Sequence, residues 1–146
     1  FVAENDVNMV IETNRGHHLG RIITHGSAEP NTGIPGNIGG FTAQRVMRAP
    51  VSGIFRTTRK IGDMVEHGDS IGEVDDGKMQ AEVVGRVEGV IRGLIRKDTH
   101  VNKGLKIGDI DPRGDKTYCY TISDKARAIA GSLLEAVLRR FNGVNL

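Results

Sequence analysis

Five charged or titratable side chains near the start of the chain could bind an anion. They are Glu12, Arg15, His17, His18 and Arg21. Guanidinium and imidazole groups bind phosphate, molybdate or a pterin phosphate through charge-assisted hydrogen bonds, and the intervening Gly16 would let backbone amides approach the ligand. A polar hairpin tip without a ligand explains the same residues. A small enzyme that uses Arg15, His17 and His18 is a further alternative.

The next segment, 26–40, has glycine or proline at nearly half of its positions, which argues against a helix or a central strand. Its polar side chains include Glu29, Asn31, Thr32 and Asn37. A long loop beside a compact domain is usually functional or disordered. The segment is therefore either a lid or inter-subunit contact, or a plain linker.

Cys119 is the single cysteine and lies between Tyr118 and Tyr120. It could carry selenium or sulfur as a persulfide-type adduct if its thiolate were stabilised, but a cysteine between aromatic residues is also typical of a buried strand. A zinc site made by His17, His25 and Cys119 would have no recognised ligand spacing, so we expect no metal site. One cysteine excludes an internal disulfide and fits a reducing cytoplasm.

The elements that position these residues include a duplicated unit. Residues 49–75 and 85–111 align without a gap, 36 positions apart. Eight aligned pairs are identical: Val51/Val87, Gly53/Gly89, Arg56/Arg92, Val65/Val101, Gly68/Gly104, Ile71/Ile107, Gly72/Gly108 and Asp75/Asp111. Short apolar runs with frequent glycine turns predict a small, curved β structure with two equivalent halves. Asp76-Gly77 between the copies predicts a hairpin, with a local twofold axis passing near it.

Simpler elements flank the repeat. Residues 7–13 and 19–24 are rich in β-branched side chains and predict a short β hairpin. Apolar residues at helical spacing over 123–141 predict one amphipathic helix, with Ser123 as N-cap and Gly143 as stop. Its apolar stripe must pack on the β module or on another subunit. We therefore expect a mainly β chain in three parts: 1–48, a barrel at 49–111, and 112–146 with the helix.

Composition excludes several classes of function. Lys and Arg number 20 against 18 Asp and Glu, aromatic residues make up 4%, and no basic run is present, so nucleic-acid binding is not expected. No apolar run approaches the length of a membrane span. The chain begins with Phe1, which favours a fragment or a processed product.

The repeat resembles the barrel-sandwich hybrid of lipoyl and biotinyl carrier domains. The matching residues are Ala49, Pro50, Gly53, Ile54, Gly62, Asp63, Val65, Gly68 and Ile71. In those domains the modified lysine lies on the hairpin between the halves, and the resemblance places Lys78 there. However, biotin carriers have a small residue and a methionine immediately before the modified lysine, whereas this chain has Asp76-Gly77. Lys78 is therefore also explained as a solvated turn residue, and we do not expect biotin or lipoate. Ser123-Asp124-Lys125-Ala126 matches the lipoyl acceptor tetrapeptide but is interpreted as a helix cap.

A longer resemblance covers most of the chain. Segments 12–21, 26–40, 48–55, 89–96, 106–113 and 119–138 together resemble the C-terminal portion of the selenium-dependent molybdenum hydroxylase accessory protein family. That resemblance implies a cytoplasmic maturation role, with the hydroxylase or its maturation proteins as partners and a selenium species or molybdenum cofactor precursor as ligand. It also implies an additional N-terminal nucleotide-binding-like region that is absent here. We expect this fragment to bind a ligand or partner rather than to catalyse alone, with a second copy of the chain as one further partner.

Overall fold

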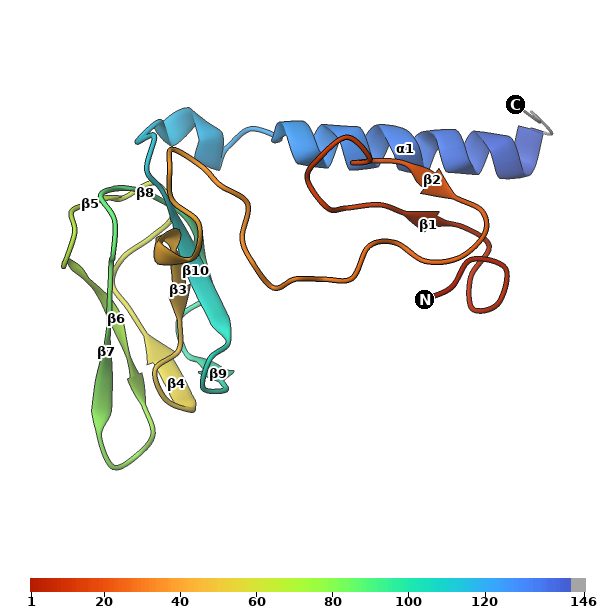
Figure 1. Cartoon of the computed structure of the whole chain (residues 1–146). Helices are drawn as coiled ribbons and strands as arrows, with labels where there is room; N and C mark the ends of the chain where they lie inside the picture. The colour runs from red at the N-terminus through yellow and green to blue at the C-terminus, as the bar shows by residue number, and fades with distance from the viewer. Residues whose placement is uncertain (143–146) are drawn as a thin grey trace. The chain divides into compact units, whose positions relative to one another are not determined.

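The computed structural model describes residues 1–142 and divides the chain into two units (Figure 1). The barrel unit is Ile34–Thr121, and the hairpin–helix unit combines Phe1–Gly33 with the chain from Ile122 onward. Gly143, the expected helix stop, lies outside the described residues.

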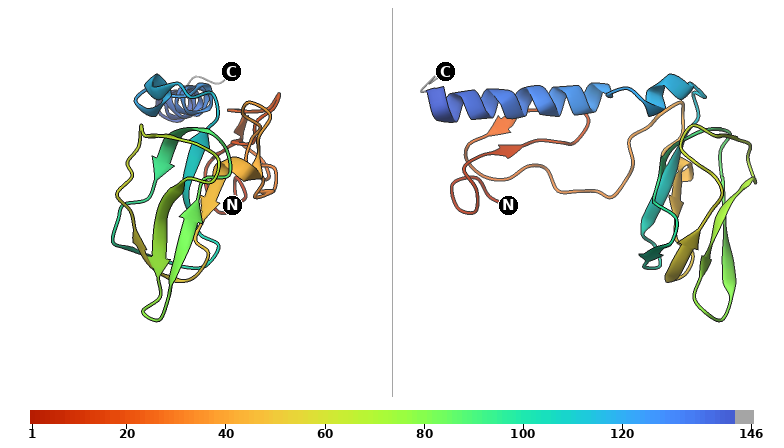
Figure 2. Two further views of the ribbon diagram at one scale, coloured as in Figure 1. Left: turned by 90° about the vertical axis from the view of Figure 1, so that its left-hand side faces the viewer. Right: turned by 180° about the vertical axis from the view of Figure 1, so that it is seen from behind.

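Two four-stranded antiparallel sheets form the barrel unit (Figures 1 and 2). The first sheet has the order β3-β10-β8-β5, with β3 at Val46–Arg48, β10 at Lys106–Asp111, β8 at Gly89–Leu94 and β5 at Met64–Val65. The second has the order β7-β6-β4-β9, with β7 at Gln80–Val84, β6 at Ser70–Asp75, β4 at Gly53–Arg56 and β9 at Thr99–Val101. Two 3₁₀ turns flank the strands, η1 at Ala43–Arg45 and η2 at Lys116–Cys119.

The two sheets have equivalent strands in the same order, as the repeat predicts. Adding 36 to the residue numbers of β6 gives β10, and the same shift takes β4 to β8, β5 to β9 and β3 to β7. The turns also match: Gly68 N donates to Gly85 O at 2.8 Å, and the equivalent Gly104 N donates to Ala49 O at 2.8 Å. The barrel-sandwich hybrid and the mainly β fold class are thereby confirmed.

Equivalent apolar side chains from both repeats fill the space between the sheets. Phe55 and Ile91 are completely buried, and Ile71 and Ile107 are each only 1% exposed. The same core contains the pairs Val65/Val101 and Val74/Ile110. Burying such a side chain stabilises a fold by about 1.5–3 kcal/mol, so the repeated apolar pattern accounts for the closure of the barrel.

Gly53 and Gly89 show why the repeat retains glycine at the start of β4 and β8. A Cβ on Gly53 would lie 2.2 Å from Asp75 O, and one on Gly89 would lie 2.2 Å from Asp111 O. No side chain fits against a backbone atom at that separation. The absence of a Cβ allows the paired strands to approach closely in both halves.

The local twofold axis lies elsewhere than the sequence suggests. β3 and β7 are equivalent strands at the edges of their sheets and contact each other, so the axis passes between them. The turn 76–79 corresponds by number to 112–115, which leaves the barrel towards η2. The Asp76-Gly77 hairpin forms as predicted, but its expected position on the axis is wrong because the repeat relates it to a distant segment.

The hairpin–helix unit contains the two expected strands and the expected helix. β1 (Val10–Ile11) and β2 (Ile22–Ile23) pair antiparallel, with Val10 opposite Ile23. The helix α1 spans Asp124–Asn142, and Ser123 Oγ accepts from Ala126 N at 3.2 Å, which confirms the N-cap. No helix in the described part of the chain is long and apolar enough to cross a bilayer.

Two faces of α1 differ in what they contact, and the expected packing of the apolar stripe on the β module or on another subunit stays a prediction. Small residues make the contact: Ala136 is buried, and a Cβ on Gly20 would lie 2.7 Å from Ser132 Oγ. The larger apolar side chains are exposed, namely Leu133, Leu134, Val137, Leu138 and Phe141. Close approach of the β1–β2 connection requires small side chains, so the apolar stripe is not the face that packs on the hairpin.

Candidate functional site

Lys78 occupies the tip of the hairpin between β6 and β7. The turn is shaped by Gly77, at φ +86°, and by two carboxylates. Asp75 Oδ1 accepts from Gly77 N at 2.9 Å, and Asp76 Oδ1 accepts from both Lys78 N and Met79 N at 2.8 Å. These amides, that of Met79 foremost, lower the pKa of the Asp76 carboxyl.

This turn is held by hydrogen bonds and is accessible. Lys78 and its neighbours are exposed, and the hairpin tip lies at the end of the barrel unit opposite η2 (Figure 1). An amine at such a tip can reach a modifying enzyme or a partner surface without disturbing the core. Modification of Lys78 stays a prediction.

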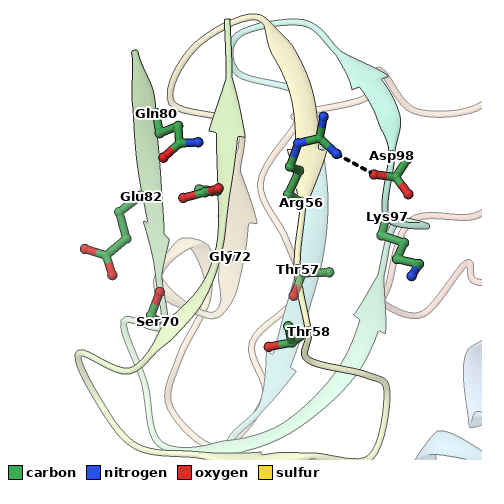
Figure 3. Close-up of a pocket in the computed structure, with 10 residues that line it drawn as sticks. Arg56, Thr57, Thr58, Ser70, Gly72, Gln80, Glu82, Lys97 and Asp98 are labelled. Carbon is green, nitrogen blue, oxygen red and sulfur yellow. Dashed lines mark hydrogen bonds and ion pairs between the residues drawn. The ribbon is translucent and has the colours of Figure 1, made fainter. Parts of the chain in front are cut away.

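A groove of about 590 Å³ lies on the outer face of the second sheet (Figure 3). Its lining residues are Arg56, Thr57, Thr58, Ser70, Gly72, Glu73, Gln80, Glu82, Lys97 and Asp98. They come from β4 and the residues that follow it, from β6 and β7, and from the turn before β9. The lining offers carboxylates, hydroxyls and cations, and none of these described residues is a histidine, cysteine or tyrosine. That chemistry suits polar recognition.

Charges on the groove are arranged in a row across the strands. Arg56 lies opposite Glu73 on β6, and Glu73 lies opposite Glu82 on β7. Arg56 Nη1 donates to Asp98 Oδ1 at 2.9 Å rather than to either glutamate (Figure 3). Asp98 has φ +64°, an uncommon backbone conformation for which Asp is one of the better-suited residues. The two glutamates therefore form a like-charge cross-strand pair, an arrangement that costs stability.

No sequence motif marked this groove. Its residues are mostly single polar positions on three strands and on the segments beside them, and their residue types are common on protein surfaces. The available signal was the difference between the repeats at outward positions: Thr57 stands where the second copy has Gly93, and Ser70 where it has Lys106.

The predicted anion cluster is in the connection between β1 and β2. Glu12 is 4% exposed, and its carboxylate accepts from Asn14 N and from Glu29 N, both at 2.7 Å. These backbone donors, that of Asn14 first, lower the pKa of the Glu12 carboxyl. Glu12 therefore joins the hairpin to the start of the 26–40 loop, and its two oxygens already serve a structural purpose.

The basic side chains of the cluster are more accessible than Glu12. Arg15 forms a bidentate pair with Asp124 at the start of α1, with N–O distances of 2.7 and 2.8 Å. His17 and His18 are exposed, and their rings meet edge-on with centroids 5.1 Å apart. Arg21 is exposed as well. An anion at Arg15 would have to compete with the Asp124 carboxylate, and the anion site stays a prediction.

The predicted loop residues lie beside this hairpin. Glu29 Oε2 accepts from Asn14 Nδ2 at 2.6 Å. Asn31 Oδ1 accepts from Gly33 N at 2.9 Å and closes a local turn, and Thr32 is exposed. The structure therefore brings Glu12, Asn14 and Glu29 together, as one polar network.

Cys119 ends the 3₁₀ turn η2 rather than lying in a strand. Its Sγ is half-buried and donates weakly to Ile91 O at 3.6 Å. His17 and His25 belong to the other unit, with His25 Nε2 3.0 Å from Glu4 Oε1. Within residues 1–142, no three His, Cys, Asp or Glu side chains form a group that could hold a metal ion.

Comparison with known proteins defines the class of the barrel. A family model described as "Biotin-requiring enzyme" matches residues 45–110. The matched range begins just before β3 and ends in β10, so it contains the hairpin with Lys78. Together with the duplicated sheets, this match defines a lipoyl-like barrel-sandwich domain.

The chain is similar along most of its length to one curated protein, "Uncharacterized protein YqeB" from Escherichia coli (strain K12). The two are 49% identical over 138 residues, which is 94% of this chain and 25% of that protein. The chain thus spans about a quarter of the length of the curated relative it matches. That name specifies no substrate or pathway.

Solved structures show weaker likenesses. An aspartoacylase family protein from Mesorhizobium loti is 18% identical at a TM-score of 0.41, covering 47% of this chain and 23% of its own. A succinylglutamate desuccinylase/aspartoacylase from Rhodobacter sphaeroides is 22% identical at a TM-score of 0.40, covering 47% and 22%. These values are too low to transfer any activity.

Proposed function

We propose that this chain is a binding module of a protein that matures selenium-dependent molybdenum hydroxylases, and that it recognises a partner or ligand rather than catalysing a reaction alone. The pathway is supported by the ordered resemblance of segments 12–21, 26–40, 48–55, 89–96, 106–113 and 119–138 to that accessory family. A lipoyl-like domain supports a carrier or partner-binding role.

The groove on the second sheet is the observation that carries the binding role. It is open, about 590 Å³ in volume, and lined by hydrogen-bonding groups on a rigid sheet. Preformed polar surfaces on rigid elements recognise partners with little ordering cost. The partners would be the hydroxylase or its other maturation proteins, and the ligand a selenium species or molybdenum cofactor precursor.

Biolayer interferometry with a purified selenium-dependent molybdenum hydroxylase tests this proposal. The chain is immobilised, and the hydroxylase is supplied with and without its labile selenium. We expect saturable binding that differs between the two forms, and no binding of an unrelated flavoprotein of similar charge. If neither form binds and cells lacking the protein mature the hydroxylase normally, the proposal is wrong.

A second function, a swinging-arm carrier modified at Lys78, is favoured by the position of that lysine. It lies at an exposed hairpin tip that Asp75 and Asp76 hold in shape. Carrier chemistry needs an amine that extends beyond the barrel so that an attached arm can move.

Intact mass spectrometry after co-expression with biotin and lipoyl ligases tests the carrier role. A carrier gains the mass of one biotinyl or lipoyl group, and Lys78→Arg removes that gain. Lys116→Arg, at another exposed lysine of the barrel unit, is the matched control and should retain it. If the unsubstituted chain shows no gain in mass, the carrier role is wrong.

A further inference from the structure

The two sheets of the barrel unit are equivalent, but their outer faces are covered differently. On the first sheet, β10 presents Asp109 and Asp111, and segments of the chain outside the repeat supply arginines to both. Arg45 Nη1, from η1, donates to Asp109 Oδ2 at 3.1 Å. Arg113 Nη2 donates to Asp111 Oδ2 at 2.6 Å. This face therefore carries guanidinium groups seated against carboxylates.

The repeat places corresponding carboxylates on the second sheet. Shifting by 36 residues takes Asp109 to Glu73 and Asp111 to Asp75, both on β6. The same shift takes Arg45 to Ala81 and Arg113 to Gly77, so the second face lacks both arginines. The acidic positions are retained, and of the arginines that contact Asp109 and Asp111 only Arg92 has an arginine, Arg56, at the equivalent position.

Exposure follows the same division. The side chain of Arg92 on the covered face is 23% exposed, whereas that of its equivalent Arg56 is 52% exposed. Asp111 is 1% exposed, and its equivalent Asp75 is only half-buried. The open face forms the groove of Figure 3.

Two adjacent carboxylates on the open face would also be stabilised by a cation. Glu73 lies directly across from Glu82, and like charges at opposed strand positions repel. Neither carboxylate has an ion-pair partner among residues 1–142, and the nearby Arg56 is paired with Asp98. A guanidinium placed over the row would neutralise the repulsion and could donate to both carboxylates, since its planar fork presents several N–H groups.

We infer that this groove binds an extended, arginine-bearing segment of a partner protein, with one guanidinium against Glu73 and Glu82 as Arg45 lies against Asp109 in the other half. The inference rests on the proposed binding role and adds the surface and the chemistry of the partner. Thr57, Thr58 and Ser70 offer hydroxyl groups to the backbone or polar side chains of the same segment. Arginine is preferred to lysine because two carboxylates side by side match a fork better than a point charge.

Fluorescence anisotropy with synthetic peptides tests this inference. The probe is a fluorescein-labelled peptide with the sequence Ser-Thr-Arg-Thr-Arg-Thr-Ser, and its matched forms carry lysine, citrulline or glutamate at both arginine positions. Citrulline keeps the shape of arginine and removes its charge. We expect the arginine peptide to bind most tightly, the citrulline peptide about tenfold or more weakly, and the glutamate peptide least.

Variants of the chain place the binding in the groove. Glu73→Gln and Glu82→Gln should each weaken binding of the arginine peptide by about tenfold and reduce its dependence on salt. Glu88→Gln, at an exposed glutamate outside the groove lining, is the matched control and should bind as the unsubstituted chain does. Circular dichroism and tyrosine fluorescence verify that each variant is folded.

The inference is overturned by equal binding of the arginine and citrulline peptides, by unchanged binding of the arginine peptide to Glu73→Gln and Glu82→Gln, or by absence of binding to every peptide. Tighter binding of the glutamate peptide would likewise contradict it. If the peptides fail while the hydroxylase binds the chain, the groove assignment is wrong and the binding role stands. If both fail, both are wrong.

Discussion

Replacing Gly53 with alanine should destabilise the barrel unit by about 3–5 kcal/mol. The new Cβ would lie 2.2 Å from Asp75 O and 2.9 Å from Asp76 N, whereas ordinary contacts begin near 3.4 Å. Strand β6 must therefore retreat from β4 by about 1 Å, which breaks hydrogen bonds of normal length. Losing about two such bonds costs roughly 1 kcal/mol each, and overpacking adds about 1–3 kcal/mol.

Urea unfolding followed by tyrosine fluorescence measures this loss, because both tyrosines, Tyr118 and Tyr120, belong to the barrel unit. Gly131→Ala is the matched control: nothing lies within 4 Å of its new Cβ, and it is in α1. Helix propensity predicts that Gly131→Ala stabilises by up to about 1 kcal/mol, seen in the helical circular dichroism signal.

The reasoning is refuted if Gly53→Ala unfolds within about 0.5 kcal/mol of the unsubstituted chain, the range of ordinary surface substitutions. The equivalent substitution Gly89→Ala should also lower the free energy of unfolding, since its Cβ would lie 2.2 Å from Asp111 O. A tolerated change at either position would mean that β4 and β6, or β8 and β10, are not packed as closely as described.

Three further predictions concern single side chains. The pKa of the Asp111 carboxyl is lowered, chiefly by hydrogen bonds from Arg113. The ionised carboxylate therefore contributes its full stabilisation above the unfolded pKa of about 3.9, and this stabilisation is lost as the pH falls below that value. The difference in unfolding free energy between the unsubstituted chain and Asp111→Asn should shrink over that range. If the hairpin binds molybdate or phosphate, calorimetric titration should show that Arg15→Ala abolishes binding. Asp124→Asn should strengthen binding, because it removes the carboxylate charge that competes for Arg15. If no form of the chain binds either anion, the anion-site hypothesis is wrong. Iodoacetamide should alkylate Cys119 more slowly than free cysteine, because Cys119 is half-buried and its thiol donates to a backbone carbonyl. A rate faster than that of free cysteine would instead support a thiolate able to carry selenium or sulfur.

The barrel was predictable because its pattern is written twice. Each repeat places apolar residues such as Ile71 and Ile107 at equivalent inward positions, and glycines such as Gly53 and Gly89 where strands approach. The axis was misplaced because the contact between the edge strands β3 and β7 is a tertiary contact, whereas the hairpin signal at Asp76-Gly77 is local.

The face of α1 that packs on the hairpin was not predicted, for a related reason. Periodicity identifies the most apolar stripe, but the hairpin packs on Ala136 and Ser132 because its backbone at Gly20 comes too close for larger side chains. The acidic groove was missed altogether, since the residues that form it, Glu73 and Glu82 among them, are ordinary on a surface and become a site only when three strands align them.

Each repeat contributes one strand to the sheet of the other. β5 of the first copy pairs with β8 of the second, and β9 of the second pairs with β4 of the first. Half of the barrel therefore cannot complete its own sheet. A chain carrying a single copy would leave one edge of β4 or β8 without its partner strand unless it associated with a second molecule.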